Sequence, residues 1–195
     1  AKFNDLVEFI DCNFLAVAVF RESDFLIDAT FRNTSFLGPS DFTASKFQNS
    51  VDFSGSQFAD DADFCSVIFN GPADFSRSTF FEKINLQDTE FNKNVHFESC
   101  RINTLNLTRS RYEWLFLHWD SVSHLEKDDE AYQKLISNYE RLQWQKDSSD
   151  CRSTCFNETK AEPAKDYSWI MEMLNIDRFT RGFALLPEQG TATND

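Results

Sequence analysis

The sequence comprises 195 residues, of which 32 are acidic and 19 basic, and its formal net charge is −13. This charge makes direct nucleic-acid binding unexpected, because an acidic chain repels phosphate backbones. The 22 Phe are accompanied by only 5 Gly and 4 Pro, too few turn-forming residues for a sandwich of hairpins, and no apolar run approaches the ~20 residues of a membrane span.

From the start of the chain, phenylalanine recurs at steps that alternate between five and six residues. The repeat unit is therefore eleven residues long and consists of two similar halves. With Phe3 at the start and Leu86, Ile102 and Leu107 as replacements, there are 20 half-units, and Phe is central in 17 of them. The uninterrupted series is Phe9, Phe14, Phe20, Phe25, Phe31, Phe36, Phe42, Phe47, Phe53, Phe58, Phe64, Phe69, Phe75 and Phe80.

The residue two positions before each central residue is small or apolar, as at Ala62 and Ala73, and it is never charged. The residue between them is mostly polar, as at Asp63 and Asp74. This alternation is typical of a short β-strand with two inward positions and one outward position. Because a strict five/six spacing cannot keep Phe on one face of a helix, the pattern predicts a β-solenoid in which like residues stack.

The stretches Ala62–Ser66 and Ala73–Arg77 match a known unit, in which a small residue, Asp or Asn, Leu or Phe and two variable residues follow one another. Over residues 1–109 the sequence thus resembles the pentapeptide-repeat family. The resemblance implies a right-handed quadrilateral β-helix with four short strands per coil, and the extra residue in alternate units implies 22 residues per coil. We therefore expect an all-β solenoid of about five coils, followed by a C-terminal helical segment.

The register also predicts which side chains stack in the interior. Residues 22 positions apart are expected to lie above one another in four columns. The columns are Phe9, Phe31, Phe53, Phe75 and Phe97; Phe14, Phe36, Phe58, Phe80 and Ile102; Phe20, Phe42, Phe64, Leu86 and Leu107; and Phe3, Phe25, Phe47, Phe69 and Phe91.

The two ends of such a solenoid need cover for their apolar side chains and strand edges. At the first coil we expect either an upstream segment or another subunit, for example a second copy that forms a homodimer through the solenoid end. At the other end, residues 110–121 contain Tyr112, Trp114 and Trp119 and are interpreted as a plug, in the form of a last irregular coil. A partner-binding patch in this segment remains the alternative.

Residues 122–195 are expected to form a helical tail with a polar loop. Ser123 and Glu126 fit a capping box, and the apolar spacing predicts a helix over about 124–146. The polar loop is placed at 147–163 and a shorter helix near 164–176, while 182–195 is expected to be extended or disordered. Cys151 and Cys155 lie in the expected loop, where either a local disulfide or free surface thiols would fit.

The tail carries a second, looser resemblance. Its residues Tyr132, Leu135, Tyr139, Trp169 and Gly182-Phe183 are similar to the helical tails of repeat proteins that continue into a two-helix ion-channel module. This resemblance implies a membrane-associated assembly. The expected location of the protein is the cytoplasm, and this resemblance adds association with a membrane protein as a hypothesis.

The sequence shows no phosphate-binding glycine loop, nucleophile elbow or zinc-ligand spacing, so we expect no catalytic, cofactor-binding or metal site. Its most regular polar feature is a series of aspartates at eleven-residue intervals. At 22 residues per coil, Asp41 stacks with Asp63 and Asp52 with Asp74, on opposite faces. Such side chains are expected to accept turn hydrogen bonds. The alternative is a charge ladder that mimics DNA, by which some members of the family protect gyrase.

These observations predict a non-enzymatic protein–protein interaction or scaffold module, with DNA mimicry toward a type II topoisomerase such as gyrase as the alternative. The partner is expected to be another protein. The candidate interaction surface consists of Asp41, Asp52, Asp63, Asp74, Tyr112, Trp114 and Trp119.

Overall fold

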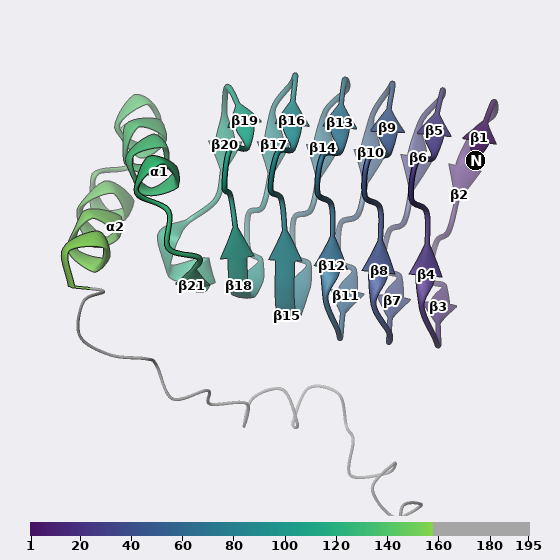
Figure 1. The fold of residues 1–195 in the computed structure, drawn as a ribbon, viewed down its shortest axis with the longest axis horizontal. Helices are drawn as coiled ribbons and strands as arrows, with labels where there is room; N and C mark the ends of the chain where they lie inside the picture. Colours follow the sequence, from purple (N-terminus) through teal and green to yellow (C-terminus); the bar gives the residue numbers. More distant parts are fainter. Residues whose placement is uncertain (158–195) are drawn as a thin grey trace, which may run out of the picture. The chain divides into compact units, whose positions relative to one another are not determined.

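The computed structural model describes residues 1–157, which lie within one compact unit, Ala1–Thr159. In this unit, short parallel strands wind into a β-solenoid of six coils, and two helices follow the last coil (Figure 1). The predicted solenoid with a helical segment is confirmed. The expected helix near 164–176 and the expected extended end at 182–195 lie outside the described residues.

The strands form four ladders, one for each side of a coil. The first contains β1 (Lys2–Phe3), β5 (Asp24–Phe25), β9 (Lys46–Phe47), β13 (Ile68–Phe69), β16 (Glu90–Phe91) and β19 (Arg111–Tyr112). The second contains β2 (Val7–Glu8), β6 (Ala29–Thr30), β10 (Val51–Asp52), β14 (Ala73–Asp74), β17 (Val95–His96) and β20 (Leu115–Phe116). The third starts with β3 (Asn13–Phe14), β7 (Ser35–Phe36) and β11 (Gln57–Phe58), and the fourth with β4 (Ala18–Val19), β8 (Ser40–Asp41) and β12 (Ala62–Asp63).

The third and fourth ladders are joined by longer strands in the later coils. β15 (Thr79–Asn85) pairs with both β11 and β12, and β18 (Arg101–Asn106) pairs with β15 and with β21 (Val122–Leu125). The register between β15 and β18 shifts between Phe80 and Lys83, from 22 residues to 21. This shift accommodates the five-residue step from Ile102 to Leu107, where the repeat requires six.

The expectation of about five coils was one too low. Residues 110–121, which we interpreted as a plug, contain β19, β20 and the short 3₁₀ helix η1 (Trp119–Ser121). β19 and β20 pair in parallel with β16 and β17 and thus begin a sixth coil, as the irregular coil of our interpretation would. β21 completes this coil against β18.

The interior is built from the predicted columns of stacked rings. In the column through Phe53, neighbouring ring centroids are 4.7–5.3 Å apart, and the rings of Phe31, Phe53 and Phe75 are parallel within 8°. Rings of adjacent columns meet edge to face, as Phe53 does with Phe42 at 5.3 Å. Both arrangements are favourable for aromatic quadrupoles. The side chains from Phe25 to Phe80 that belong to these columns are at most 1% exposed.

Inward hydroxyl and thiol groups tie successive coils together at two of the corners. The side chains of Ser45, Ser56 and Ser78 donate hydrogen bonds of 2.5–2.8 Å to main-chain carbonyls 25 residues earlier. Cys100 occupies an equivalent position, and its thiol donates to the carbonyl of Phe75. The recurrence of Ser, Thr and Cys two residues before a central residue is explained by these bonds, since a buried carbonyl without a partner would be costly.

The corner turns contain a residue with positive φ once in almost every eleven residues. Examples are Asn33, Ala44 and Gly55, with φ of 55°, 55° and 71°. In the turn at Asn33, the amide of Thr34 donates to the carbonyl of Phe31, as in a β-turn whose third residue is left-handed. Side chains in this conformation are strained, yet nine non-glycine residues of the solenoid adopt it, from Asp11 to Arg109. The fold therefore needs fewer turn glycines than a sandwich would.

The first helix starts later and ends earlier than the sequence predicts. α1 spans Asp129–Arg141, and its N-cap is Asp128, whose carboxylate accepts from the amides of Glu130 and Ala131. The expected capping box, Ser123 and Glu126, instead lies in and next to β21. A second helix, α2 (Gln145–Asn157), replaces the first part of the expected polar loop. A turn with Gln143 at a φ of 60° separates the two helices.

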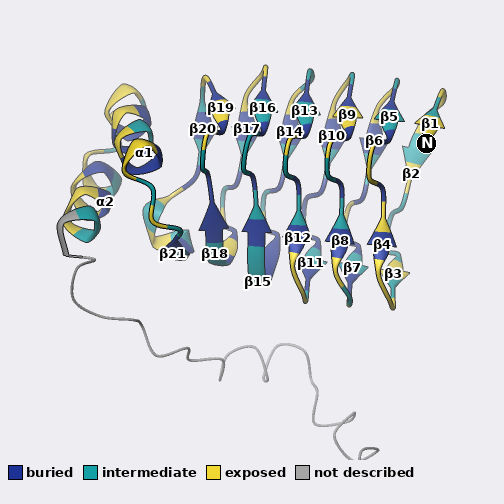
Figure 2. Cartoon of the chain, in the orientation of Figure 1, coloured by how far each residue is buried: buried dark blue, intermediate teal, exposed yellow. Residues whose placement is uncertain are grey.

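Figure 2 shows how burial changes along the unit, with dark blue on β15 and β18 and more yellow on β3 and β4. The buried face of α1 comprises Ala131, Tyr132, Leu135, Ile136, Asn138 and Tyr139, and it packs on the core. No helix among residues 1–157 is long and apolar enough to cross a membrane.

Candidate interaction surface

The four aspartates lie on two ladders, paired as the sequence predicts. Asp41 and Asp63 are register partners in the fourth ladder, and Asp52 and Asp74 are partners in the second. Between β10 and β12 the chain passes through β11 of the third ladder, so the two pairs face opposite sides of the coil. Partners in adjacent strands are ~4.8 Å apart, a distance at which like charges repel.

Each of these carboxylates accepts a hydrogen bond from the main-chain amide two residues later. The acceptors Asp41, Asp52, Asp63 and Asp74 lie 2.7–2.9 Å from the amides of Thr43, Ser54, Cys65 and Ser76. The expectation that the aspartates serve as turn acceptors is confirmed. One carboxylate oxygen thus holds the corner in place, and this bond also offsets part of the repulsion along the ladder.

The fourth ladder adds further polar contacts around its aspartates. The guanidinium of Arg21 donates to Asp41 at 2.8 Å, and the amide of Asn85 donates to Asp63 at 3.0 Å. Burial by itself would raise the pKa of Asp41, but the hydrogen bonds from Thr43 and Arg21 outweigh it and the pKa is lowered. Asn106 then donates to Asn85, so an amide row continues the ladder after the two aspartates.

In the second ladder, the two aspartates are flanked by residues that are not acidic. Thr30 precedes Asp52, and His96 follows Asp74 in register. The imidazole of His96 stacks on Phe116 at 4.7 Å and lies 3.2 Å from the carboxylate of Glu98. Neither aspartate ladder is therefore a continuous acidic stripe, since each contains only two neighbouring carboxylates.

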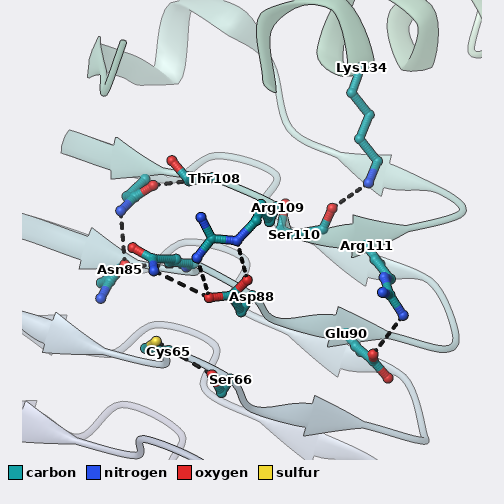
Figure 3. Close-up of polar contacts among 12 residues, drawn as sticks. Cys65, Ser66, Asn85, Asp88, Glu90, Thr108, Arg109, Ser110, Arg111 and Lys134 are labelled. Atoms are coloured by element: carbon teal, nitrogen blue, oxygen red, sulfur yellow. Dashed lines mark hydrogen bonds and ion pairs between the residues drawn. The ribbon is translucent and has the colours of Figure 1, made fainter. Parts of the chain in front are cut away.

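Ion pairs between coils neutralise the surface near the last two coils (Figure 3). Arg109 makes two hydrogen bonds of 2.6 Å with Asp88, and Arg111 makes one of 2.9 Å with Glu90. The hydrogen bonds from Arg109 lower the pKa of Asp88. Because all four side chains are exposed to solvent, these pairs order the surface and add little stability.

The three predicted aromatic residues lie at the junction with the helices, away from the aspartate pairs. Tyr112 is buried, and the ammonium group of Lys134 on α1 lies 4.7 Å from its ring centroid. Trp114 is half-buried beneath the guanidinium of Arg141, at 4.9 Å. Trp119 is partly buried against the core. The structure therefore does not gather the seven candidate residues on one surface.

Side chains of α1 bond to main-chain groups of the sixth coil, on the side where no further coil follows. Asn138 accepts from the amide of Leu115 at 3.2 Å and donates to its carbonyl at 2.8 Å. Lys134 donates to the carbonyl of Ser110 (Figure 3), and Arg141 donates to that of Glu113. Burial lowers the pKa of Lys134. In this way α1 occupies the place of a seventh coil and terminates the solenoid.

α2 contributes a second contact to this closure. The carboxylate of Asp147 accepts from the amide of Trp119 at 2.7 Å and lies 3.3 Å from the imidazole of His118. The ring of His118 stacks on Trp144, which precedes α2, at 4.2 Å. The pair Cys151 and Cys155 is reduced in the structure, and Cys151 is buried rather than a surface thiol.

The sequence analysis did not identify the contacts by which α1 covers the last coil, nor the exposed apolar residues of the first coil. The contacts of Asn138 depend on how α1 docks, and no local pattern indicates them. The exposed apolar residue Val17 is different, because Asp61 and Lys83 occupy its repeat position in later coils, and this comparison could have revealed it. Among residues 1–157, no group of three or more His, Cys, Asp or Glu is placed to hold a metal ion.

Comparison with known proteins identifies the repeat. The family model for pentapeptide repeats, with nine copies, matches residues 31–79. No curated protein and no solved structure matches the chain. The matched residues coincide with the coils in which rings stack on rings and aspartates accept the turn bonds. Residues 31–79 of the solenoid are thus identified as pentapeptide repeats, the repeat that the sequence resembles.

Proposed function

We propose that the chain is a non-enzymatic docking module that binds another protein through the outer side chains of its solenoid. The observation that carries this proposal is the fixed spacing of those side chains. The stacked Phe columns set the separation of the coils, and the turn bonds set the direction of the carboxylates. Repeat solenoids commonly use such regular faces to bind partners.

Asp52 and Asp74 are the strongest candidates for direct contacts on these faces. Each uses one carboxylate oxygen, Oδ1, for its turn bond, so Oδ2 is available to a donor on a partner. Asp41 is less available, since Arg21 occupies its second oxygen. A partner with basic side chains about one coil apart, or ~4.8 Å, would match the pair on the second ladder.

DNA mimicry receives less support than protein docking in general. A mimic needs a long row of negative charge, whereas each aspartate ladder continues into neutral or basic residues such as Asn85 and His96. A second form of the proposal rests on the resemblance of residues 122–195 to the helical tails of channel-linked repeat proteins. In this form, the module docks on a channel-like membrane protein from the cytoplasm.

Crosslinking capture from the soluble and membrane fractions of the source cells, read by mass spectrometry, tests the docking function. The test variant replaces Asp41, Asp52, Asp63 and Asp74 by Asn, because the amide oxygen of Asn can still accept the turn bond while the charge is lost. The expected result is a protein that the wild type enriches and this variant does not.

A control variant, Asp120→Asn with Asp150→Asn, removes charges from exposed positions of η1 and α2 and is expected to capture the same protein. Recovery of a membrane protein would support the channel-linked form, and recovery of gyrase subunits would favour mimicry. If the wild type enriches no protein over an unrelated acidic protein of similar size, the docking function is contradicted.

A further inference from the structure

Among residues 1–155, the large apolar side chains that are exposed all belong to the first two coils. They are Leu6, Leu15, Val17, Val19, Ile27 and Leu37. Leu15, Val17 and Val19 are 77%, 61% and 65% exposed; Leu15 and Val17 lie in the corner between β3 and β4, and Val19 is the outward residue of β4 next to it. A cluster of this kind on a water-facing corner indicates a binding surface.

The corner is continuous from the first coil to the second. Phe14 pairs with Phe36, so Leu15 and Leu37, which follow them, lie in adjacent coils at the same repeat position. A Cβ atom on Gly38 would lie 2.9 Å from the carbonyl carbon of Ala16, so only glycine allows this close approach of the two coils. We call Leu15, Val17, Val19 and Leu37 the apolar corner.

In the third coil the same corner is acidic, and in the fourth it carries Glu82 next to Lys83, whose ammonium group pairs with Glu126 at 2.6 Å. The repeat position of Ala16 and Gly38 is occupied by Asp60 and then Glu82, and that of Val17 by Asp61 in the third coil. Asp60 and Asp61 are exposed, and within residues 1–157 no basic side chain lies within ion-pair distance of Asp60, Asp61 or Glu82. We call these three residues the acidic corner. Its centre is two coils, or ~10 Å, from that of the apolar corner.

We propose that the two corners together bind an amphipathic cationic segment of a partner protein. Its apolar side chains lie on the apolar corner, and its lysine or arginine side chains lie on the acidic corner. Two turns of an α-helix span ~11 Å, which matches the separation of the two corners. This inference rests on the proposed docking function and specifies the chemistry of the partner.

Charge distinguishes this occupant from two others. A second copy brings a further net charge of −13 to a surface that is already acidic. Residues 158–195 of the chain itself contain seven acidic and four basic residues, so they do not supply a basic segment either. A cationic partner complements both halves of the corner.

Fluorescence anisotropy with a designed peptide tests the proposal. The probe is a labelled leucine/lysine helix of about fourteen residues, with leucines in the first two turns and lysines in the last two on the same face. A matched peptide with glutamate in place of lysine is the probe control. The protein variants are Leu15→Ser with Val17→Ser, Asp60→Asn with Asp61→Asn, and the distant control Asp120→Asn with Asp150→Asn.

The wild type is expected to bind the lysine peptide saturably and not the glutamate peptide. Each corner variant should weaken binding ~10-fold or more, and the acidic-corner variant should also reduce its salt dependence. The distant control should bind within about twofold of the wild type. Circular dichroism and melting temperatures, which these exposed substitutions should leave unchanged, show that each variant is folded.

Equal binding of the lysine peptide by the wild type and both corner variants would overturn the proposal. So would a dimer in sedimentation that Leu15→Ser with Val17→Ser converts to monomer, since a second copy would then cover the corner. Binding of the wild type to zwitterionic vesicles that requires Leu15 and Val17 would assign the corner to a membrane instead. If the corner variants still capture the cellular partner, only this inference fails and the docking function stands.

Discussion

Each interior phenylalanine contacts rings in its own column and in the adjacent ones. Phe53 is fully buried, with Phe31 and Phe75 stacked at 4.7 and 5.0 Å and Phe42 and Phe64 edge to face at 5.3 and 5.4 Å. We predict that Phe53→Ala lowers the free energy of unfolding by ~3–5 kcal/mol, because the neighbouring rings cannot collapse into the cavity.

Urea or thermal unfolding of this variant checks the prediction. The control is Gln57→Ala at an outward position of the next strand, which should change stability by less than ~0.5 kcal/mol. An unchanged melting temperature for Phe53→Ala would contradict the assignment of Phe53 to the interior.

At the outward positions, the structural and binding roles of aspartate can be separated. Asp74→Ala removes the 2.7 Å bond from the amide of Ser76 and should destabilise the chain by ~1 kcal/mol. Asp74→Asn retains an acceptor and should be close to neutral. Unfolding curves of the two variants give the comparison, and equal losses would mean that charge rather than the turn bond is responsible.

The buried thiol of Cys100 gives a prediction about pH. Burial raises its pKa to about 12 from 9.0. Because the thiol ionises more readily in the unfolded chain, the stability that it contributes is full below pH ~9 and is lost as the pH rises toward 12.

Thiol reactivity tests the burial of Cys100 on which this prediction rests. At pH 8 the partly exposed Cys12, Cys65 and Cys155 should react rapidly with Ellman's reagent, while the buried Cys100 and Cys151 should react only as the protein opens. Five thiols that react at one fast rate would contradict the burial of these two residues.

At the scale of elements, the docking of α1 on the last coil depends on one buried amide. We predict that Asn138→Leu destabilises the chain by ~2–4 kcal/mol, because the amide and carbonyl of Leu115 both lose their partner in a buried site. Gln133→Ala, on the exposed side of the same helix, should be nearly neutral. Hydrogen exchange should locate the loss at β20, and unaltered protection there would argue against the proposed closure.

The elements that the sequence predicts well are those with strict periodicity. The strands from Phe9 to Leu107 could be assigned because each inward position repeats at five or six residues. The sixth coil was interpreted as an irregular plug and left out of the coil count, because its register shortens to 21 and 20 residues and its inward positions are Tyr112, Leu115 and Leu117 rather than Phe. The start of α1 was misplaced because Ser123 and Leu125, which fit the start of a helix, instead belong to β21 and complete the last coil as a strand.

At the scale of the whole molecule, the candidate surface was only partly accessible to prediction. The pairing of Asp41 with Asp63 and of Asp52 with Asp74 follows from the 22-residue coil alone. Two further features depend on contacts between segments that are distant in the sequence. Arg21 bonds to the second carboxylate oxygen of Asp41, and α1 covers Tyr112. The sequence therefore predicts the rows of the solenoid, and the structure determines which of their members are available.

If residues 22 positions apart lie side by side on one face of a stacked coil, cysteines placed at two such positions should be close enough to bridge. Crosslinking in the folded chain, with Cys12, Cys65 and Cys155 replaced by Ser, measures this proximity. The in-register pair is Ser35→Cys with Gln57→Cys, which are partners in the third ladder. The control pair is Thr30→Cys with Gln57→Cys, because Thr30 belongs to the second ladder.

With a short thiol-bridging reagent such as dibromobimane, we expect rapid bridging of the in-register pair and none of the control pair. Bridging of the in-register pair should be lost in urea. Equal bridging of both pairs, or of the control pair alone, would contradict the 22-residue coil and every surface row derived from it.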